Sequence, residues 1–129
     1  MYFKIRAWDK ESKVMYYPRS LGFVDCELEF IERNNEKLNE FGDNSQVVLM
    51  VSTGLKDING KEIYEGDIIQ LAPPDDEWKG FVIFKNGAFS IMYQNGDIVP
   101  LYDELYDFQG KPYLYVIGNV FENPELLRE

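Results

Sequence analysis

Short turn-forming sequences divide the second half of the chain at intervals of about eight to twelve residues, a spacing typical of small β-barrels and sandwiches. They include residues 57–60 (Asp-Ile-Asn-Gly), the interruption at 65–67 (Glu-Gly-Asp), the loop at 73–77 (Pro-Pro-Asp-Asp-Glu), 86–87 (Asn-Gly), 95–97 (Asn-Gly-Asp) and 110–112 (Gly-Lys-Pro). Asn and Gly tolerate the positive φ angles of tight hairpin turns, so an Asn-Gly pair between apolar runs strongly indicates a β-hairpin. The turns therefore predict many short antiparallel strands.

The segments between the turns have the composition of strands. Residues 2–8 and 21–31 alternate apolar with polar side chains, which predicts strands that bury one face. Residues 47–51 are continuously apolar, as in a strand that is buried on both faces. The other expected strands are residues 14–17, 63–71, 79–85, 88–93, 98–101 and 113–121. Gly66 predicts a β-bulge within its strand, and Asn123 before Pro124 predicts a short C-terminal helical turn.

The charge of the chain limits its partners. It has 23 acidic and 13 basic residues, a net charge of −10. Affinity for nucleic acid comes mainly from Lys and Arg that neutralise phosphates, so direct nucleic-acid binding is not expected. Residues 1–20 are the exception, with five basic and two acidic side chains. This basic end could help one copy to meet another, but solvated surface is the simpler interpretation.

Residues for common catalytic arrangements are scarce. There is no histidine and one cysteine, Cys26, which excludes Ser-His-Asp and Cys-His pairings and an intramolecular disulfide. Residues 57–60 superficially resemble the start of a calcium loop. However, their glycine stands at position four instead of six, and Ile68 occupies position twelve, where the loop has a glutamate. A turn is the better interpretation, and no metal or cofactor is expected.

Carboxylates offer a minor catalytic hypothesis. A carboxylate-dependent hydrolase needs two carboxyl groups about 5–10 Å apart. Acids in or near predicted loops could converge in this way: Asp67, Asp75, Asp76, Glu77 and Asp97. Because acids are most often only surface residues, the hypothesis stays secondary.

Aromatic residues are numerous, with nine Tyr, nine Phe and two Trp. Most should belong to the core, but Tyr and Trp also favour protein–protein interfaces. The surplus therefore predicts an interaction surface, with these candidates: Trp8, Trp78, Tyr93, Tyr113 and Tyr115.

Four separated blocks resemble, in the same order, the YopX family of small phage and prophage proteins. They are FKIRAWDKESKVMYY (3–17), STGLKDINGKEIYEGDII (52–69), GFVIFKNGAFSI (80–91) and VIGNVFENPELL (116–127). The resemblance implies a mainly β fold with a small SH3-like β-barrel in the second half, an N-terminal β subdomain and short helical pieces. Residues 1–46 would form the N-terminal hairpin and strand region with a polar loop at 32–46. Residues 47–129 would form the barrel and its C-terminal helical turn.

The same resemblance implies self-association and no catalytic motif, because the family has no known biochemical function. The main prediction is a phage-encoded, non-catalytic protein-interaction module that forms homo-oligomers, with a host protein as a second class of partner. The alternatives are a nucleic-acid-associated protein or acidic DNA mimic and, less favoured, the hydrolase. No apolar run reaches the roughly 20 residues of a membrane helix, and the N-terminus lacks a signal-peptide pattern. The cytoplasm of the host cell is therefore the expected location.

Overall fold

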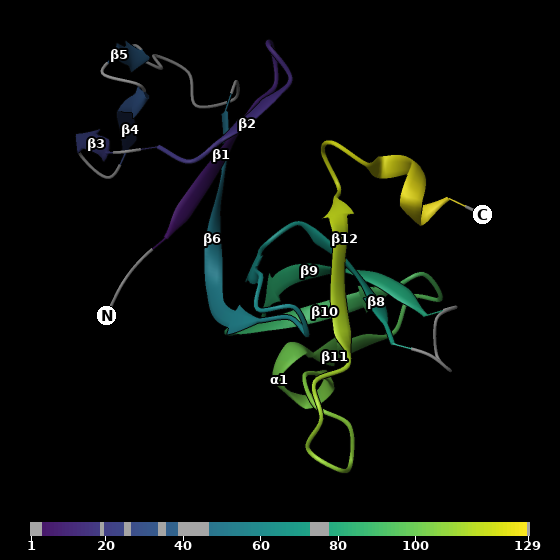
Figure 1. Ribbon diagram of the computed structural model, residues 1–129. Helices are drawn as coiled ribbons and strands as arrows, with labels where there is room; N and C mark the ends of the chain where they lie inside the picture. Colours follow the sequence, from purple (N-terminus) through teal and green to yellow (C-terminus); the bar gives the residue numbers. More distant parts are fainter. Residues whose placement is uncertain are drawn as a thin grey trace. The chain divides into compact units, whose positions relative to one another are not determined.

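A computed structural model describes residues 4–18, 20–24, 27–33, 36–38, 47–72 and 78–128. The chain divides into two compact units, Met1–Val51 and Ser52–Glu129, and the boundary falls within one long strand, β6 (Val47–Lys56) (Figure 1). No helix in these residues is long and apolar enough to cross a membrane.

A hairpin forms the first part of the N-terminal unit. Strands β1 (Ile5–Asp9) and β2 (Val14–Tyr16) pair antiparallel, and β1 also pairs with the first half of β6. The Asp9 carboxylate closes the hairpin turn by accepting hydrogen bonds from the Glu11 and Ser12 backbone amides. Ala7, Tyr16 and Val47 form a small buried cluster.

A separate three-stranded antiparallel sheet follows in the order β3 (Ser20–Val24), β4 (Glu27–Arg33) and β5 (Glu36–Leu38). The prediction of a single strand over residues 21–31 was wrong, since β3 and β4 pair antiparallel within that range. Period-two alternation reports which face a side chain occupies and not the direction of the chain, so a tight reversal can leave it uninterrupted. Cys26 and residues 39–46 of the expected polar loop lie outside the described residues.

The C-terminal unit is a curled five-stranded antiparallel sheet that forms half a barrel (Figure 1). Its order is β11 (Ile98–Pro100), β10 (Ala88–Tyr93), β9 (Lys79–Lys85), β8 (Asp67–Leu71) and β12 (Leu114–Asn119). The second half of β6 pairs with β7 (Glu62–Tyr64). The prediction of a mainly β fold with a small barrel-like second half is confirmed.

Local turn chemistry sets the register of this unit. Asn86 and Gly87 have φ angles of 52° and 82° and join β9 to β10, as expected for an Asn-Gly hairpin. Gly66, with φ of 84°, lies in a tight turn that separates β7 from β8. The prediction of one continuous strand over residues 63–71 with a bulge was therefore wrong, because a full turn interrupts it.

The core of the barrel unit is mainly aliphatic and includes Tyr93. Strands β8, β9, β10 and β12 contribute Ile69, Val82, Ile91 and Leu114 to it. The single-turn helix α1 (Leu101–Glu104) adds Leu101, and Leu105 follows directly after it. The predicted terminal turn is present as the 3₁₀ helix η2 (Pro124–Leu127). Asn123 precedes it but does not cap it, because its side-chain oxygen accepts a hydrogen bond from the Asn119 amide.

Candidate functional site

Two hollows of about 290 Å³ each adjoin Tyr93, at the end of β10 in the barrel unit. The first, here called the Trp78 cavity, is lined by Leu71, Trp78, Tyr93, Asp97, Val99 and Glu104. The second, the Leu127 pocket, is lined by Phe81, Met92, Tyr93, Gln94, Gly96 and Leu127.

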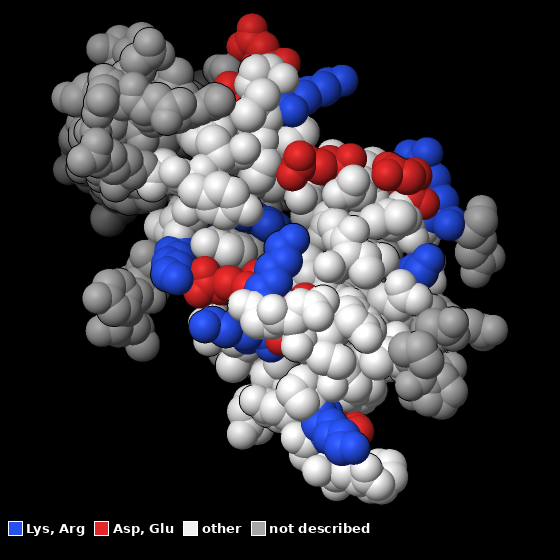
Figure 2. All heavy atoms as spheres, viewed as in Figure 1, with Lys and Arg blue, Asp and Glu red and all other residues white. Residues whose placement is uncertain are grey.

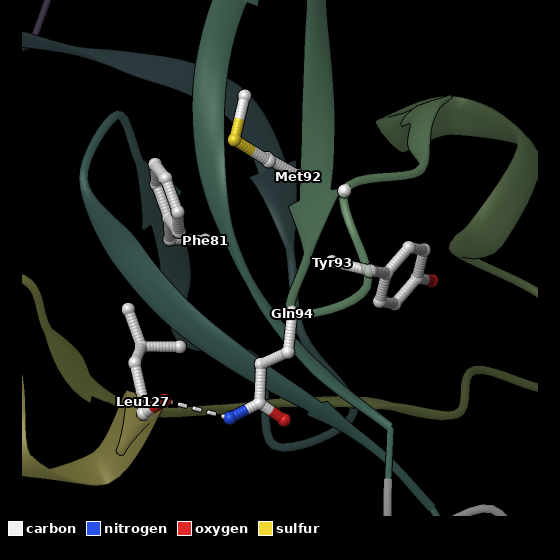
Figure 3. A pocket seen from close by; sticks show the side chains of 6 residues that line it. Phe81, Met92, Tyr93, Gln94 and Leu127 are labelled. Atoms are coloured by element: carbon white, nitrogen blue, oxygen red, sulfur yellow. Dashed lines mark hydrogen bonds between the residues drawn. The ribbon is translucent and has the colours of Figure 1, made fainter. Parts of the chain in front are cut away.

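The Leu127 pocket marks the place where the C-terminal turn approaches the sheet. The Gln94 side-chain amide donates a hydrogen bond to the Leu127 carbonyl at 2.8 Å (Figure 3). Figure 3 also shows that the Tyr93 ring points away from Phe81 and Leu127. Tyr93 therefore directs its ring towards the Trp78 cavity. The Leu127 pocket is a gap left where the C-terminal turn packs against the sheet.

An aromatic pair forms one wall of the Trp78 cavity. The rings of Trp78 and Tyr93 meet edge to face, with centroids 5.5 Å apart and an interplanar angle of 83°. Trp78 is 45% exposed although Tyr93 is only 6% exposed, so the indole covers the tyrosine and still presents its own surface to solvent. The Leu71 amide donates to the Trp78 carbonyl at 3.1 Å, which fixes the tryptophan backbone at the start of β9.

Glu104, at the end of α1, supplies one acidic group. Its Oε2 atom accepts a hydrogen bond from the Tyr113 hydroxyl at 2.7 Å. The Tyr93 hydroxyl is buried and makes no hydrogen bond of acceptable geometry with the described residues, although the Glu104 side chain lies near enough to act on it. Burial, reinforced by the negative charge of Glu104 and by Tyr113, raises the pKa of Tyr93 far above its usual value. Tyr93 therefore stays a neutral hydroxyl throughout the physiological range.

Asp97 supplies the second acidic group, from the turn between β10 and β11. Its carboxylate accepts a hydrogen bond from the Asn95 side-chain amide at 3.0 Å, and its own backbone amide donates to the Asn95 side-chain oxygen. The Tyr93 amide donates to the Asp97 carbonyl at 2.9 Å, which ties this turn to the aromatic wall. In the part of the chain that is described, no basic side chain pairs with Glu104 or Asp97.

The predicted interaction residues have different positions. Trp78 and Tyr93 lie together in the cavity, and Tyr113 contributes through its hydrogen bond to Glu104. Trp8 belongs to the N-terminal unit and is 8% exposed. Tyr115 is half-buried on β12, opposite Gln70, and does not line the cavity.

Sequence reasoning missed Glu104 and the apolar walls. Glu104 precedes Leu105 in a segment whose leucines show helical spacing, but only the folded unit brings it to Tyr93 and Tyr113. Leu71 and Val99 come from different strands, and their shared cavity has no local signature. The exposure of Tyr102, Tyr106 and Phe108, after the start of α1, was also not anticipated.

Other acids that the sequence singled out have structural partners. Asp57 is 6% exposed, and its carboxylate accepts from three backbone amides, those of Asn59, Lys61 and Val116. Asp67 is buried and accepts from the Tyr64 amide at 2.8 Å. Asp75, Asp76 and Glu77 lie outside the described residues. Within the described ranges, no group of three or more acidic, Cys or His side chains is placed to hold a metal ion.

Comparison with known proteins identifies relatives along the whole chain. The family described as YopX protein matches residues 4–128. The crystal structure of protein EF1440 from Enterococcus faecalis is similar, with a TM-score of 0.70, 31% identity and 99% of each chain covered. The X-ray structure of protein yopX from Bacillus subtilis has a TM-score of 0.63 and 23% identity, covers 98% of this chain and 96% of its own, and shows likeness of fold alone. No curated protein matches the chain.

Proposed function

The chain belongs to the YopX protein family, and on this premise we propose that it is a non-catalytic protein-interaction module that assembles with further copies of itself. The family has no established biochemical function, so the support for this proposal has to come from the surface of the barrel unit.

The observation that carries the proposal is a run of exposed aromatic side chains in residues 102–108. Tyr102 is 71% exposed, Tyr106 51% and Phe108 96%, all within seven residues. Phe108 follows Asp107, whose carboxylate holds a tight turn by accepting from the Gln109 and Lys111 amides. The turn therefore presents the ring of Phe108 to solvent on an ordered support. Ordered, exposed aromatic rings are a feature of protein–protein contacts, since they bury much apolar area at little entropic cost.

Self-assembly is tested by sedimentation velocity of the full chain over a range of concentrations. We expect a concentration-dependent shift to larger species, and its loss in the double variant Tyr102→Ser with Phe108→Ser. Phe84→Ser is the matched control, because Phe84 is 56% exposed on β9 and lies in a different part of the unit. A wild-type chain that stays monomeric at tens of micromolar overturns self-assembly.

A hydrolase is a second candidate because Asp97 and Glu104 line one cavity beside Trp78. A pair of carboxyl groups that flank one site is the arrangement used in glycoside hydrolysis. The test is turnover of chromogenic glycosides, which must be absent in both Glu104→Gln and Asp97→Asn if the wild-type chain shows it.

The nucleic-acid alternatives have less support. On the face shown in Figure 2, basic and acidic side chains of the described residues are interspersed. Phosphate binding depends on a continuous positively charged surface, and DNA mimicry on a continuous negatively charged one. A mobility-shift assay at low salt tests direct DNA binding. A pull-down from host lysate that recovers DNA-binding proteins would favour the mimic over self-assembly.

A further inference from the structure

We infer that the Trp78 cavity binds the cationic end of an arginine or lysine side chain that a partner protein presents. This inference deepens the proposed function and rests on it, because it assigns a chemical class to one contact of a protein-interaction module. The cavity combines three features that together select such a group: an aromatic wall, two carboxylates without a basic partner among the described residues, and a buried hydroxyl that makes no hydrogen bond of acceptable geometry with them.

The aromatic wall favours a cation over an anion or a neutral polar group. The π-face of an aromatic ring carries partial negative charge, and tryptophan attracts cations more strongly than tyrosine or phenylalanine. Trp78 lies edge to face with Tyr93, which holds the indole in place while leaving 45% of the residue accessible. An incoming cation would therefore meet a fixed platform and lose little side-chain entropy by ordering it.

Glu104 and Asp97 give the cavity a negative charge. Glu104 uses Oε2 for the Tyr113 hydroxyl, and within the described residues Asp97 bonds only to the neighbouring Asn95 side chain and its own turn. Two carboxylates with no basic partner in the described part of the chain disfavour any anionic ligand, and a bound ammonium or guanidinium would offset their charge.

The Tyr93 hydroxyl is the observation that most directly points to a missing partner. The residue is 6% exposed, lines the cavity and has no hydrogen-bond partner for its oxygen among the described residues. Buried polar groups without a partner are uncommon, since leaving one unsatisfied costs about 1–3 kcal/mol. As a neutral hydroxyl beside Glu104, Tyr93 can accept a hydrogen bond from the same donor group that pairs with the carboxylate.

The size and walls of the cavity match one side chain. Its volume of about 290 Å³ is at the lower limit of the roughly 300–1,000 Å³ of typical small-molecule sites. Leu71 and Val99 add apolar surface against which an aliphatic stem can pack while its charged end reaches the acids. A guanidinium is the better fit of the two cations, because it is planar, stacks on aromatic faces and donates several hydrogen bonds at once.

The test is a titration of the full chain with N-acetyl-arginine methylamide, followed by NMR at the Trp78 indole N–H, whose resonance the Trp78→Phe variant identifies. We expect a saturable shift with a Kd on the order of 1–10 mM, since one isolated side chain makes few contacts. The matched control ligand is the citrulline analogue, which has the same shape without the charge. It should bind at least about tenfold more weakly if cation recognition supplies 1.4 kcal/mol or more.

The protein side of the test uses a charge-matched pair of variants. Glu104→Gln keeps an acceptor for Tyr113 but removes the charge, and we expect it to weaken arginine binding about tenfold. Glu125→Gln removes an equal charge from exposed η2, outside the cavity, and should leave binding unchanged. Trp78→Ala should abolish the response of cavity resonances such as the Val99 methyls, whereas Trp78→Phe should retain part of it. Equal binding of arginine and citrulline, or equal effects of the two Glu variants, overturns the inference.

The outcome also separates this inference from the proposed function. A chain that stays monomeric, yet binds arginine through Trp78 and Glu104, keeps the cation site and removes self-assembly. A chain that assembles but shows no Trp78 response keeps the module and removes the cation site. If both N-acetyl-arginine methylamide and the Glu104→Gln variant cause the oligomer to dissociate, the cation comes from a second copy of the chain. If neither changes the oligomer, the cation comes from another protein.

Discussion

The Asp57 turn and the Trp78 cavity both contain a carboxylate in the barrel unit, but they use it in opposite ways. Asp57 accepts three backbone hydrogen bonds, two within its own turn and one from Val116 on β12. Among the described residues, Glu104 accepts one hydrogen bond, from the Tyr113 hydroxyl, and lies near the hydroxyl of Tyr93, which makes no hydrogen bond of acceptable geometry there. A carboxylate saturated by backbone amides builds the fold, whereas one with unused capacity in a cavity is available to a ligand.

A second turn makes the comparison sharper. Residues 107–111 repeat the Asp-x-x-Gly-Lys pattern of residues 57–61, and in both turns the aspartate Oδ1 accepts from the second and fourth following amides. In both turns the glycine has a φ angle near 80°. The difference is Oδ2, which in Asp57 reaches Val116 at 3.0 Å. The same local sequence thus gives a solvent-side turn in one place and a clasp between distant segments in the other.

The largest effect is expected for Asp57→Ala. The change removes a buried carboxylate and leaves the Asn59, Lys61 and Val116 amides without their acceptor, so the free energy of unfolding should fall by about 3 kcal/mol. Urea denaturation followed by circular dichroism measures the loss. A change below about 1 kcal/mol would show that water replaces the carboxylate and would remove the distinction between the two turns.

The next largest effect is a fall in the free energy of unfolding at alkaline pH, caused by Tyr93. Its pKa is raised in the folded state, so above about pH 10 the unfolded chain loses this proton while the folded chain keeps it. Stability then falls with rising pH, by about 1.4 kcal/mol per pH unit from this residue alone. Tyr93→Phe removes that contribution, so the variant should gain stability relative to wild type between pH 10 and 11 as measured by denaturation. If the free energy of unfolding of Tyr93→Phe and of wild type falls by the same amount between pH 10 and 11, the raised pKa of Tyr93 is contradicted.

Asp107→Ala should cost less than Asp57→Ala, about 1 kcal/mol, because its turn is exposed and water can reach the Gln109 and Lys111 amides. The same denaturation experiment measures it. Equal losses for the two aspartates would mean that the bond to Val116 contributes nothing beyond the turn itself.

The smallest effect on stability is expected for Glu104→Gln. The glutamine oxygen can still accept from Tyr113, and removal of the charge beside Tyr93 offsets part of any loss, so stability should change by less than about 0.5 kcal/mol. A loss as large as that of Asp57→Ala would place Glu104 among the residues that build the fold and would weaken its role in the cavity.

Local sequence predicted the parts of the fold that depend on local chemistry. The Asn86-Gly87 hairpin, the turn at residues 57–60 and the C-terminal helical turn follow from residues that favour positive φ or begin a helix. The errors came where one strand was predicted across two. Between β3 and β4 the alternating pattern continues although the strands run antiparallel, and between β7 and β8 a turn stands where a bulge was expected. Alternation of apolar residues cannot reveal a tight turn that preserves the period.

The candidate site was only half predictable. Trp78 and Tyr93 were predicted to be interaction residues because the chain has more aromatic side chains than a core of this size requires. Their rings are in contact. Glu104 could not be paired with Tyr93 or Tyr113 from sequence, because the contact depends on how α1 packs against β10 and β11 in the folded unit. Likewise nothing local distinguishes Asp57 from Asp107, since the bond to Val116 joins residues 59 positions apart.

The clasp between Asp57 and Val116 also bears on how copies of the chain can meet. β12 is the last strand of its five-stranded sheet, and such a strand offers unpaired amides and carbonyls to any extended chain that approaches. Here the Val116 amide is taken by the Asp57 carboxylate and the Leu114 carbonyl by the Ile58 amide. The turn thus occupies two backbone groups of this edge and places a negative charge beside them, which disfavours strand addition at residues 114–116. The self-assembly proposed above would then use side-chain contacts and not this edge.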